Sequence, residues 1–155
     1  MNQTDQTFMR VALTLAEHAL SLGESPVGAI VVDESGEIIG QAHNQREARQ
    51  SPTAHAELLA IEAAAKARGS WKLDDCTLYV TLEPCLMCAG AIMQARLKRI
   101  VYGAFADKTG ALSVGSVANV YEHKFGYNPQ VRSGVLADEC AELMNKFGEK
   151  LRGQV

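Results

Sequence analysis

The sequence predicts an α/β fold in which helices cover both faces of a central, mixed sheet of five strands. Segments with helical periodicity alternate with short, β-rich apolar runs, a pattern typical of α/β proteins. A hairpin makes the first two strands antiparallel, whereas a later strand, helix and strand in succession make their two strands parallel. With 155 residues, of which 47% are hydrophobic and 21% charged, we expect residues 1–155 to form a single globular domain.

The first half of the chain contains two predicted helices and the hairpin. Apolar residues recur at helical spacing over residues 6–22 and over residues 53–68, and a glycine follows each segment. Between the helices lie the apolar run 27–32, the turn-forming residues 33–36 and a second apolar stretch at 38–40. Turn residues between two apolar runs predict an antiparallel hairpin.

The second half contains a predicted strand, helix and strand unit, followed by one more strand and one more helix. Residues 76–82 and 99–102 are rich in β-forming residues, and a glycine ends the latter run. Residues 85–96 between them have helical character, so these two strands should be parallel. A strand at 131–136 and a C-terminal helix at 138–152 complete the prediction.

Composition excludes several classes of protein. No apolar run approaches the roughly 18 residues that span a bilayer, and the polar N-terminus lacks the basic and apolar regions of a secretory signal. We therefore expect a cytoplasmic protein without a membrane partner. In a reducing compartment Cys76, Cys85, Cys88 and Cys140 are not expected to form disulfides, and the close spacing of Cys85 and Cys88 indicates metal or thiol chemistry.

Charge is distributed unevenly along the chain. Residues 1–65 hold three basic and nine acidic side chains, whereas residues 66–155 hold twelve basic and nine acidic ones. Arg96, Lys98 and Arg99 form a small cluster in the basic part. A basic face would suit a nucleic acid, but a solvated rim around helix and strand ends is the favoured interpretation of this cluster from the sequence alone.

Three side chains at two predicted helix starts have the spacing of zinc ligands. His55 opens one helix, and Cys85 and Cys88 lie on the first turn of the next. The helix dipole and the free backbone N–H groups at a helix start favour thiolates, and Pro84 is preorganised for such a start. Three protein ligands leave the fourth position of a tetrahedral zinc open to water, which is typical of a catalytic site.

A closed structural zinc site and a dithiol redox pair are the alternatives to a catalytic zinc. The other histidines are His18, His43 and His123, and neither of the remaining cysteines stands in a paired spacing with another type of ligand, so a structural site lacks an obvious fourth member. Glu57 follows His55 by two residues and favours the catalytic interpretation, because a carboxylate beside zinc-bound water can carry protons.

His55-Ala56-Glu57 followed by Pro84-Cys85-Leu86-Met87-Cys88 matches the signature of zinc-dependent cytidine and adenosine deaminases. Within that superfamily, the chain resembles the bacterial tRNA-specific adenosine deaminases nearly from end to end. The further segments that carry this resemblance are Pro26-Val27-Gly28-Ala29, His43-Asn44, Pro52-Thr53-Ala54, Leu78 to Glu83, Cys88-Ala89-Gly90-Ala91, Lys108-Thr109-Gly110-Ala111 and Gly134 to Cys140.

The resemblance implies a three-layer α/β/α fold like that of cytidine deaminases and, as a rule, a homodimer with one zinc ion per subunit. It also implies conversion of adenosine to inosine at the wobble position (34) in the anticodon stem-loop of tRNA. Carried over residue by residue, it assigns zinc to His55, Cys85 and Cys88, proton transfer to Glu57, base binding to Asn44, Val27, Ala56 and Pro84, and RNA contacts to Asp107 and Lys108.

The chain departs from the pattern of these relatives in three places, which bear on RNA contacts and not on zinc chemistry. A deaminase of a free base or nucleoside, such as guanine or cytosine, is the alternative function; it would use the same zinc and glutamate with a small closed pocket, and the acidic balance of the chain, with a net charge of −3, mildly favours it. The departures are Phe105-Ala106-Asp107-Lys108 in place of Asp-Pro-Lys or Asp-Ala-Lys, Asn128-Pro129-Gln130-Val131 in place of Asn-His-x-Val, and Phe147-Gly148 in place of an aromatic pair.

Several other side chains are predicted to serve packing alone. Trp71 is interpreted as a packing anchor and not as a platform for a base. Met87, Met93 and Met144 fit helix faces and are predicted to lie in the core.

Overall fold

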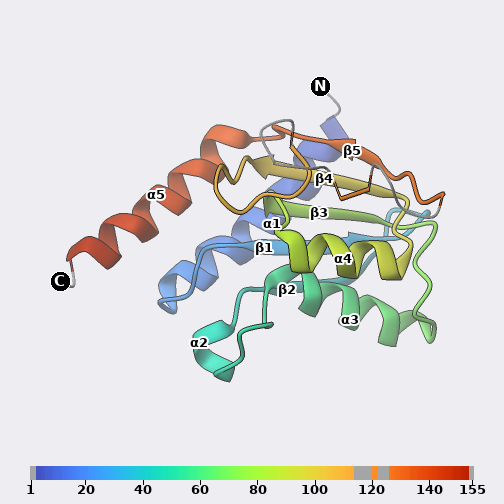
Figure 1. Cartoon of the computed structure of the whole chain (residues 1–155), viewed down its shortest axis with the longest axis horizontal. Helices are drawn as coiled ribbons and strands as arrows, with labels where there is room; N and C mark the ends of the chain where they lie inside the picture. Colours follow the sequence, from blue (N-terminus) through green and yellow to red (C-terminus); the bar gives the residue numbers. More distant parts are fainter. Residues whose placement is uncertain (1–2, 114–119, 122–125, 154–155) are drawn as a thin grey trace.

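The computed structural model describes residues 3–113, 120–121 and 126–153 (Figure 1). No helix in these ranges combines the length and the apolar character that a membrane span requires. The helices are α1 (Gln3–Ser21), α2 (Arg46–Arg49), α3 (Ala56–Arg68), α4 (Leu86–Ala95) and α5 (Ala137–Gly153). The strands are β1 (Gly28–Val32), β2 (Ile38–His43), β3 (Thr77–Leu82), β4 (Arg99–Ala104) and β5 (Gln130–Arg132).

The strands form one mixed sheet in the order β2-β1-β3-β4-β5. β1 pairs antiparallel with both β2 and β3, whereas β3 with β4 and β4 with β5 are parallel. The prediction of an antiparallel hairpin followed by parallel strands is therefore confirmed. The four longer helices begin and end within three residues of their predicted bounds, which is the usual uncertainty of helix ends.

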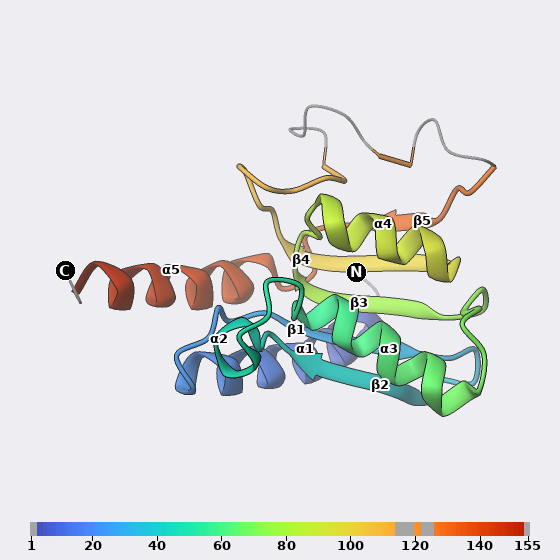
Figure 2. The same ribbon diagram turned by 60° about the horizontal axis from the view of Figure 1, so that its bottom comes forward.

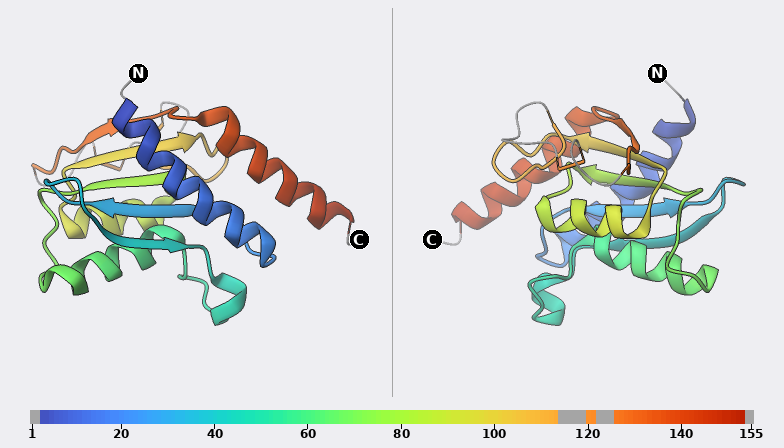
Figure 3. Two further views of the ribbon diagram at one scale, coloured as in Figure 1. Left: turned by 180° about the vertical axis from the view of Figure 1, so that it is seen from behind. Right: turned by 45° about the vertical axis from the view of Figure 1, so that its right-hand side comes forward.

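Helices cover both faces of this sheet, so the predicted three-layer α/β/α arrangement is confirmed. α3 and α4 lie on one face (Figure 2), and α1 and α5 lie on the other (Figure 3). Side chains alternate between the faces along β1: Ala29 and Val31 join the core beneath α3 and α4, while Ile30 and Val32 join the core beneath α1. This alternation follows from the two-residue period of a strand and explains why β1, between two paired strands, is buried throughout.

Two glycines allow helices to approach the sheet closely on its opposite faces. A Cβ added to Gly28 in β1 would lie 2.8 Å from the backbone nitrogen of Ala16 in α1. A Cβ added to Gly40 in β2 would lie 2.7 Å from the backbone nitrogen of Ala64 in α3. Because both distances are shorter than real Cβ contacts, each helix can sit where it does only against glycine. Gly40 therefore helps to set the position of α3.

A buried carboxylate ties α1 to three strands. The side chain of Asp5 is 1% exposed and accepts two hydrogen bonds of 2.7 Å from Arg99 of β4. The same carboxylate accepts hydrogen bonds from the Tyr79 hydroxyl in β3 (2.8 Å) and from Arg132 in β5 (3.1 Å). The Arg99 guanidinium is the main reason that the pKa of Asp5 is lowered, so this carboxylate is ionised at neutral pH.

The last strand is shorter than predicted. The sequence pattern favours a strand over 131–136, but β5 covers only Gln130–Arg132. The backbone then enters the left-handed region at Gly134 (φ 82°) and again at Leu136 (φ 53°), which ends an extended chain. Val135 between them is nevertheless fully buried, and its backbone N–H still donates to the carbonyl of Tyr102 in β4 (3.4 Å), so its apolar character reflects packing in the core and not a longer β5.

β4 is longer than predicted because Gly103 does not end it. The strand continues to Ala104, and the missing side chain of Gly103 makes room for Cys140 of α5, which a Cβ there would strike. The short helix α2 was not predicted at all. Its four residues are too few to show helical periodicity in a sequence.

Two of the side chains assigned to packing are exposed instead. Trp71 is 64% exposed and Met87 is 36% exposed, so both predictions are wrong. Trp71 follows the end of α3 and lines a groove on the outer surface of the α3 and α4 layer, away from the sheet. Met93 and Met144 pack against the core as partly buried side chains, in agreement with the prediction.

Candidate metal centre and substrate cavity

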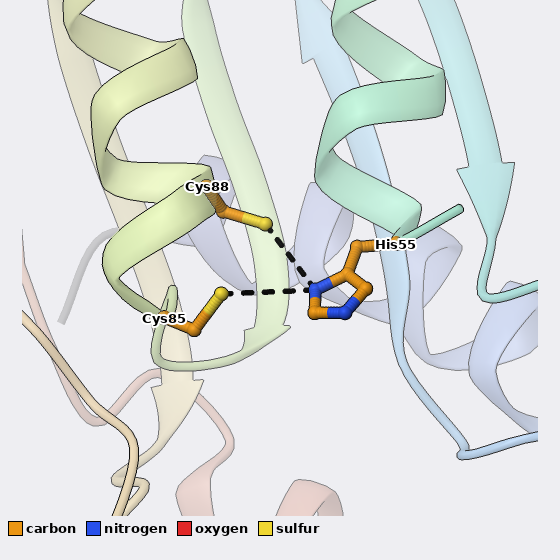
Figure 4. Close-up of side chains that lie close together, drawn as sticks. All are labelled: His55, Cys85 and Cys88. Carbon is orange, nitrogen blue, oxygen red and sulfur yellow. Dashed lines mark hydrogen bonds between the residues drawn. The ribbon is translucent and has the colours of Figure 1, made fainter. Parts of the chain in front are cut away.

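The N-termini of α3 and α4 bring together the three residues that the sequence predicted as metal ligands (Figure 4). His55 and Cys85 are the residues immediately before these two helices, and Cys88 lies in the first turn of α4. Nδ1 of His55 lies 3.7 Å from Sγ of Cys85 and 3.4 Å from Sγ of Cys88. The imidazole therefore turns its Nδ1 edge to both sulfur atoms.

These separations fit a tetrahedral zinc ion. Bond lengths of about 2.3 Å to sulfur and about 2.0 Å to nitrogen place the two donor atoms about 3.5 Å apart in a tetrahedral site. The observed distances of 3.4 and 3.7 Å lie on either side of that value. Two thiolates and an imidazole also suit zinc better than magnesium or calcium, which prefer oxygen. Within the part of the chain that the structure describes, the group of potential metal ligands consists of His55, Cys85 and Cys88.

The protonation of the two thiols is coupled. The hydrogen bond from Cys88, with a second from His55, lowers the pKa of the Cys85 thiol to about 3. The pKa of Cys88 is raised by that same hydrogen bond to Cys85 and by burial. Because zinc binds thiolates, binding of the metal to both sulfur atoms displaces any proton that remains on them.

Glu57 shares a cavity with these ligands. It lies in the first turn of α3, is 4% exposed, and lines the same cavity as His55 and Cys85. Burial raises the pKa of its carboxyl group. A buried carboxyl group with a raised pKa can both accept and donate a proton close to neutral pH, as general acid–base chemistry requires.

The cavity has a volume of about 100 Å³. Of the residues that the resemblance assigns to base binding, Asn44 and Val27 line it, whereas Ala56 and Pro84 do not. Ala56 is buried in the core beneath α3, and the carbonyl of Pro84 accepts a hydrogen bond from the backbone of Ala111. The residues that line the cavity are Ser25, Val27, Asn44, Arg46, His55, Glu57, Leu82, Glu83, Cys85 and Thr109.

Sequence reasoning missed half of this lining: Ser25, Arg46, Leu82, Glu83 and Thr109. Arg46 is exposed and is the cation among the lining residues, so it can meet an anionic group of a ligand. Ser25 and Thr109 come from loops, whose paths depend on tertiary packing. Only Glu83 carried a usable signal, because it stands at the end of a buried strand directly before Pro84.

Glu83 holds the loop that follows β4. Its carboxylate is 2% exposed and accepts hydrogen bonds from the backbone nitrogens of Ala106 (3.1 Å), Leu112 (2.9 Å) and Ser113 (2.7 Å). Gly110 packs directly against this carboxylate, and a Cβ added there would collide with it. Three charge-assisted hydrogen bonds to one carboxylate fix the loop beside the cavity.

The predicted RNA contacts lie in this same loop. Asp107 and Lys108 are exposed and immediately precede Thr109, which lines the cavity. Phe105, one of the departures from the family pattern, is 52% exposed, and its ring contacts Tyr102 edge-on with centroids 5.7 Å apart. The loop thus presents one apolar and two charged side chains to solvent near the cavity.

Among the described residues, the other histidines and cysteines stand outside the metal group. The rings of His18 and His43 contact each other edge-on, with centroids 5.1 Å apart, and His123 lies outside the described residues. Cys76 and Cys140 are buried thiols, as predicted, and burial raises the pKa of each to about 12.

A family model for the cytidine and deoxycytidylate deaminase zinc-binding region matches residues 2–104 of the chain. This span covers more than half of the sequence and includes His55, Glu57, Cys85 and Cys88. The chain belongs to this deaminase family. Zinc is the metal cofactor of the deaminase, since the family model and the His-Cys-Cys geometry agree. Membership also makes the chain a hydrolase that acts on C–N bonds.

Three similar proteins place the deaminase more closely. The tRNA-specific adenosine deaminase of Haemophilus influenzae is 46% identical over 152 residues, which are 97% of this chain and 87% of that protein. A solved structure of a tRNA:A34 deaminase, which edits A to I at the wobble position of transfer RNA, is 39% identical with a TM-score of 0.83 and covers 88% of this chain and 98% of that one. The guanine deaminase of Bacillus subtilis is 44% identical with a TM-score of 0.63, over 68% of this chain and 66% of that one.

Proposed function

We propose that this deaminase hydrolyses adenosine to inosine at the wobble position (34) in the anticodon stem-loop of tRNA. The observation that carries the proposal is a zinc-ligand set and a buried carboxylate in one cavity, within a chain that is 46% identical to a tRNA-specific adenosine deaminase over nearly its whole length. The guanine deaminase resembles only about two thirds of the chain. Because tRNA is a cytoplasmic substrate in bacteria, the cytoplasm is the compartment in which this activity would operate.

In the proposed reaction, His55, Cys85 and Cys88 hold one zinc ion per subunit. Bound zinc supplies a water whose pKa is lowered to about 7. Glu57 would take a proton from the attacking water and deliver it to N1 of adenine as the water oxygen adds to C6. Glu57 would then carry the second proton of the water to the exocyclic amine, so that the C6–N bond breaks. One water is consumed, ammonia leaves, and the base becomes hypoxanthine.

The other cavity residues would bind and orient the nucleoside. Asn44 offers an amide to the edge of the base, and Val27 supplies an apolar wall. Arg46 at the cavity lining and Lys108 in the neighbouring loop would meet phosphates of the anticodon loop, with Asp107 beside them. The target base must leave its stack to enter so small a cavity, and a single-stranded loop lowers that free-energy cost. Ala56 and Pro84 would act from behind the lining, as buried supports.

A homodimer is part of the proposal, and the outer face of α3 and α4 is the surface that supports it. Leu86 is 67% exposed and Trp71 is 64% exposed. An apolar groove of about 550 Å³ runs between the two helices and is lined by Leu58, Ile61 and Trp71 among others. An exposed aromatic side chain that lines an apolar groove marks an interaction surface. Light scattering of the purified protein should give twice the mass of the chain, and a Trp71→Glu variant should be monomeric.

The decisive experiment compares substrates for the zinc-loaded protein. An anticodon stem-loop with adenosine at the wobble position is incubated beside free adenosine, guanine and cytosine, and inosine and ammonia are measured. We expect inosine in the stem-loop alone. Ammonia from guanine or cytosine alone would refute the RNA assignment and support the free-base alternative, which the small cavity and the structural likeness to guanine deaminase favour.

A Glu57→Ala variant tests the mechanism within the same experiment. Loss of the proton carrier should lower turnover by about 1,000-fold, within the range of general acid–base catalysis. Zinc content should remain at one ion per subunit because the three ligands are untouched. A variant that deaminates at nearly the wild-type rate would remove Glu57 from the mechanism.

A further inference from the structure

A second buried carboxylate, that of Glu24, lies behind the cavity and takes no part in the reaction proposed above. Glu24 precedes β1, is 2% exposed, and is not among the residues that line the cavity. A carboxylate withdrawn from water to this degree requires donors on its oxygens. Its hydrogen-bond partners among the described residues belong to one segment, residues 44–48, which follows β2 and includes the first three residues of α2.

The hydrogen bonds of Glu24 involve both of its carboxylate oxygens. Oε1 accepts from Nδ2 of Asn44 (3.3 Å) and from the backbone nitrogen of Glu47 (3.1 Å), and Oε2 accepts from the backbone nitrogen of Ala48 (2.7 Å). The residue before α2, Gln45, makes no side-chain capping bond. Glu24 therefore supplies the acceptors that the first turn of α2 does not find in its own cap.

We propose that Glu24 is a positioning residue that fixes which end of the Asn44 amide faces the substrate. An ionised carboxylate only accepts hydrogen bonds, so the amide must turn its NH₂ group to Glu24 and cannot turn its carbonyl oxygen there. Asn44 is also held by its backbone, since its N–H donates to the carbonyl of Val27 (3.1 Å). With one N–H and the backbone fixed, the amide presents its carbonyl oxygen and its second N–H to a bound base in one defined orientation.

This inference rests on the proposed function, because it gives Asn44 the role of a base contact. Through the orientation of the Asn44 amide, Glu24 would influence which base the cavity binds, although Glu24 itself does not line the cavity. A base whose edge matches the fixed amide is bound, and a base that requires the inverted amide meets a donor opposite a donor, or an acceptor opposite an acceptor. Preorganised polar groups of this kind favour one ligand because no reorientation is needed on binding.

Glu24→Gln is the informative substitution because it preserves size and removes the acceptor-only character. The new side-chain amide can accept on one atom only, so one of the three donors in segment 44–48 loses its partner. It can also donate to the carbonyl oxygen of Asn44, which permits the inverted amide that the carboxylate forbids. Glu47→Gln is the matched control, because it removes the same charge from an exposed side chain of the same segment and leaves the backbone N–H of Glu47 in place.

The experiment measures inosine formation in the anticodon stem-loop for the zinc-loaded wild type, Glu24→Gln, Glu47→Gln, Asn44→Ala and the double variant Glu24→Gln/Asn44→Ala. We expect Glu24→Gln to lower kcat/KM about tenfold, mostly through KM, as loss of one oriented hydrogen bond to a base does. Zinc content should be unchanged, and Glu47→Gln should match the wild type. In the Asn44→Ala background, Glu24→Gln should add less than about a twofold loss, because the residue it acts through is gone.

Two results would overturn the inference. One is wild-type kcat/KM in Glu24→Gln. The other is an equal loss in both backgrounds, which would mean that Glu24 supports the fold and does not act through Asn44. Failure of the proposed function looks different, because the wild type itself would then form no inosine in the stem-loop. If it released ammonia from guanine instead, the same variants assayed on guanine would decide the role of Glu24 by the same criteria.

Discussion

Alanine at Gly40 should damage the zinc site from a distance, whereas alanine at Gly28 should not. Both glycines let a helix approach the sheet, but on opposite faces. α3 lies over Gly40 and begins directly after His55, with Glu57 in its first turn. α1 lies over Gly28 and contributes none of the residues that line the cavity. The two substitutions are chemically identical and form a matched pair.

The size of the effect follows from the contacts. At Gly40 an added Cβ would collide with the backbone carbonyl oxygen of Ala60 and lie 2.7 Å from the backbone nitrogen of Ala64, at least about 0.7 Å short of the 3.4 Å at which ordinary contact begins. At Gly28 it would collide with the carbonyl oxygen of Ala12, and the shortfall from the backbone nitrogen of Ala16 is about 0.6 Å. Because these neighbours are backbone atoms of rigid helices, we expect each variant to lose about 3 kcal/mol of unfolding free energy, the upper part of the range for overpacking.

Zinc affinity should separate the two variants. A shift of α3 by about 0.7 Å exceeds the tolerance of about 0.2 Å in metal–ligand distances, so Gly40→Ala should bind zinc about tenfold more weakly. Gly28→Ala should keep the wild-type affinity. Unfolding of the metal-free proteins in urea gives the stability, and competition with a chromophoric chelator gives the affinity. Equal zinc affinity in both variants would refute the reasoning, since it would mean that the edge strand β2 yields and α3 does not.

Two further predictions follow from buried carboxylates. Asp5→Asn should lower the unfolding free energy of the metal-free protein by about 3 kcal/mol near pH 7, because it leaves Arg99 without its buried partner. The pKa of Asp5 is lowered in the folded state, so its contribution to stability is present above the unfolded pKa of 3.8 and is lost as the pH falls through the folded pKa. The difference in unfolding free energy between variant and wild type, measured in urea, should therefore stay constant above pH 5 and shrink below pH 4. A difference that does not depend on pH would contradict this assignment. Gly110→Ala should push the loop after β4 away from the Glu83 carboxylate, because the added Cβ would collide with it. We expect kcat/KM for the stem-loop to fall about tenfold with zinc content unchanged. Unaltered kinetics would show that the position of this loop does not matter to the reaction.

The zinc site was predictable from the sequence because its geometry is largely local. Cys85 and Cys88 are brought together by one turn of helix, and a histidine directly before a helix presents its side chain at the helix start. These are short-range consequences of backbone geometry, which spacing in the chain records. The order of helices and strands was predictable for the same reason, since periods of 3.6 and 2 residues are local properties of the pattern.

The errors in the prediction occur where long-range packing decides. Val135 has the apolar character of a strand residue, but the left-handed backbone at Gly134 and Leu136 ends β5 before it, and its side chain is buried in the core. Gly103 has the character of a strand end, but it lies within β4 because Cys140 of α5 needs the space. In each case a neighbour distant in sequence determines what the residue does, and no local pattern contains that neighbour.

By itself, the sequence determined the alternation of helices and strands, and it singled out the histidine, the two cysteines and the glutamate that the structure brings together at the starts of two helices. Only the tertiary structure decided that Glu24 and Glu83 hold the segments on either side of the cavity, that Arg46 and Thr109 line it, and that Trp71 faces solvent. The reason is physical. A buried carboxylate is stabilised by backbone N–H donors, which belong to segments distant from it in the sequence. The packing of helices on the sheet places those segments next to the glutamate, and the residues on either side of the glutamate do not.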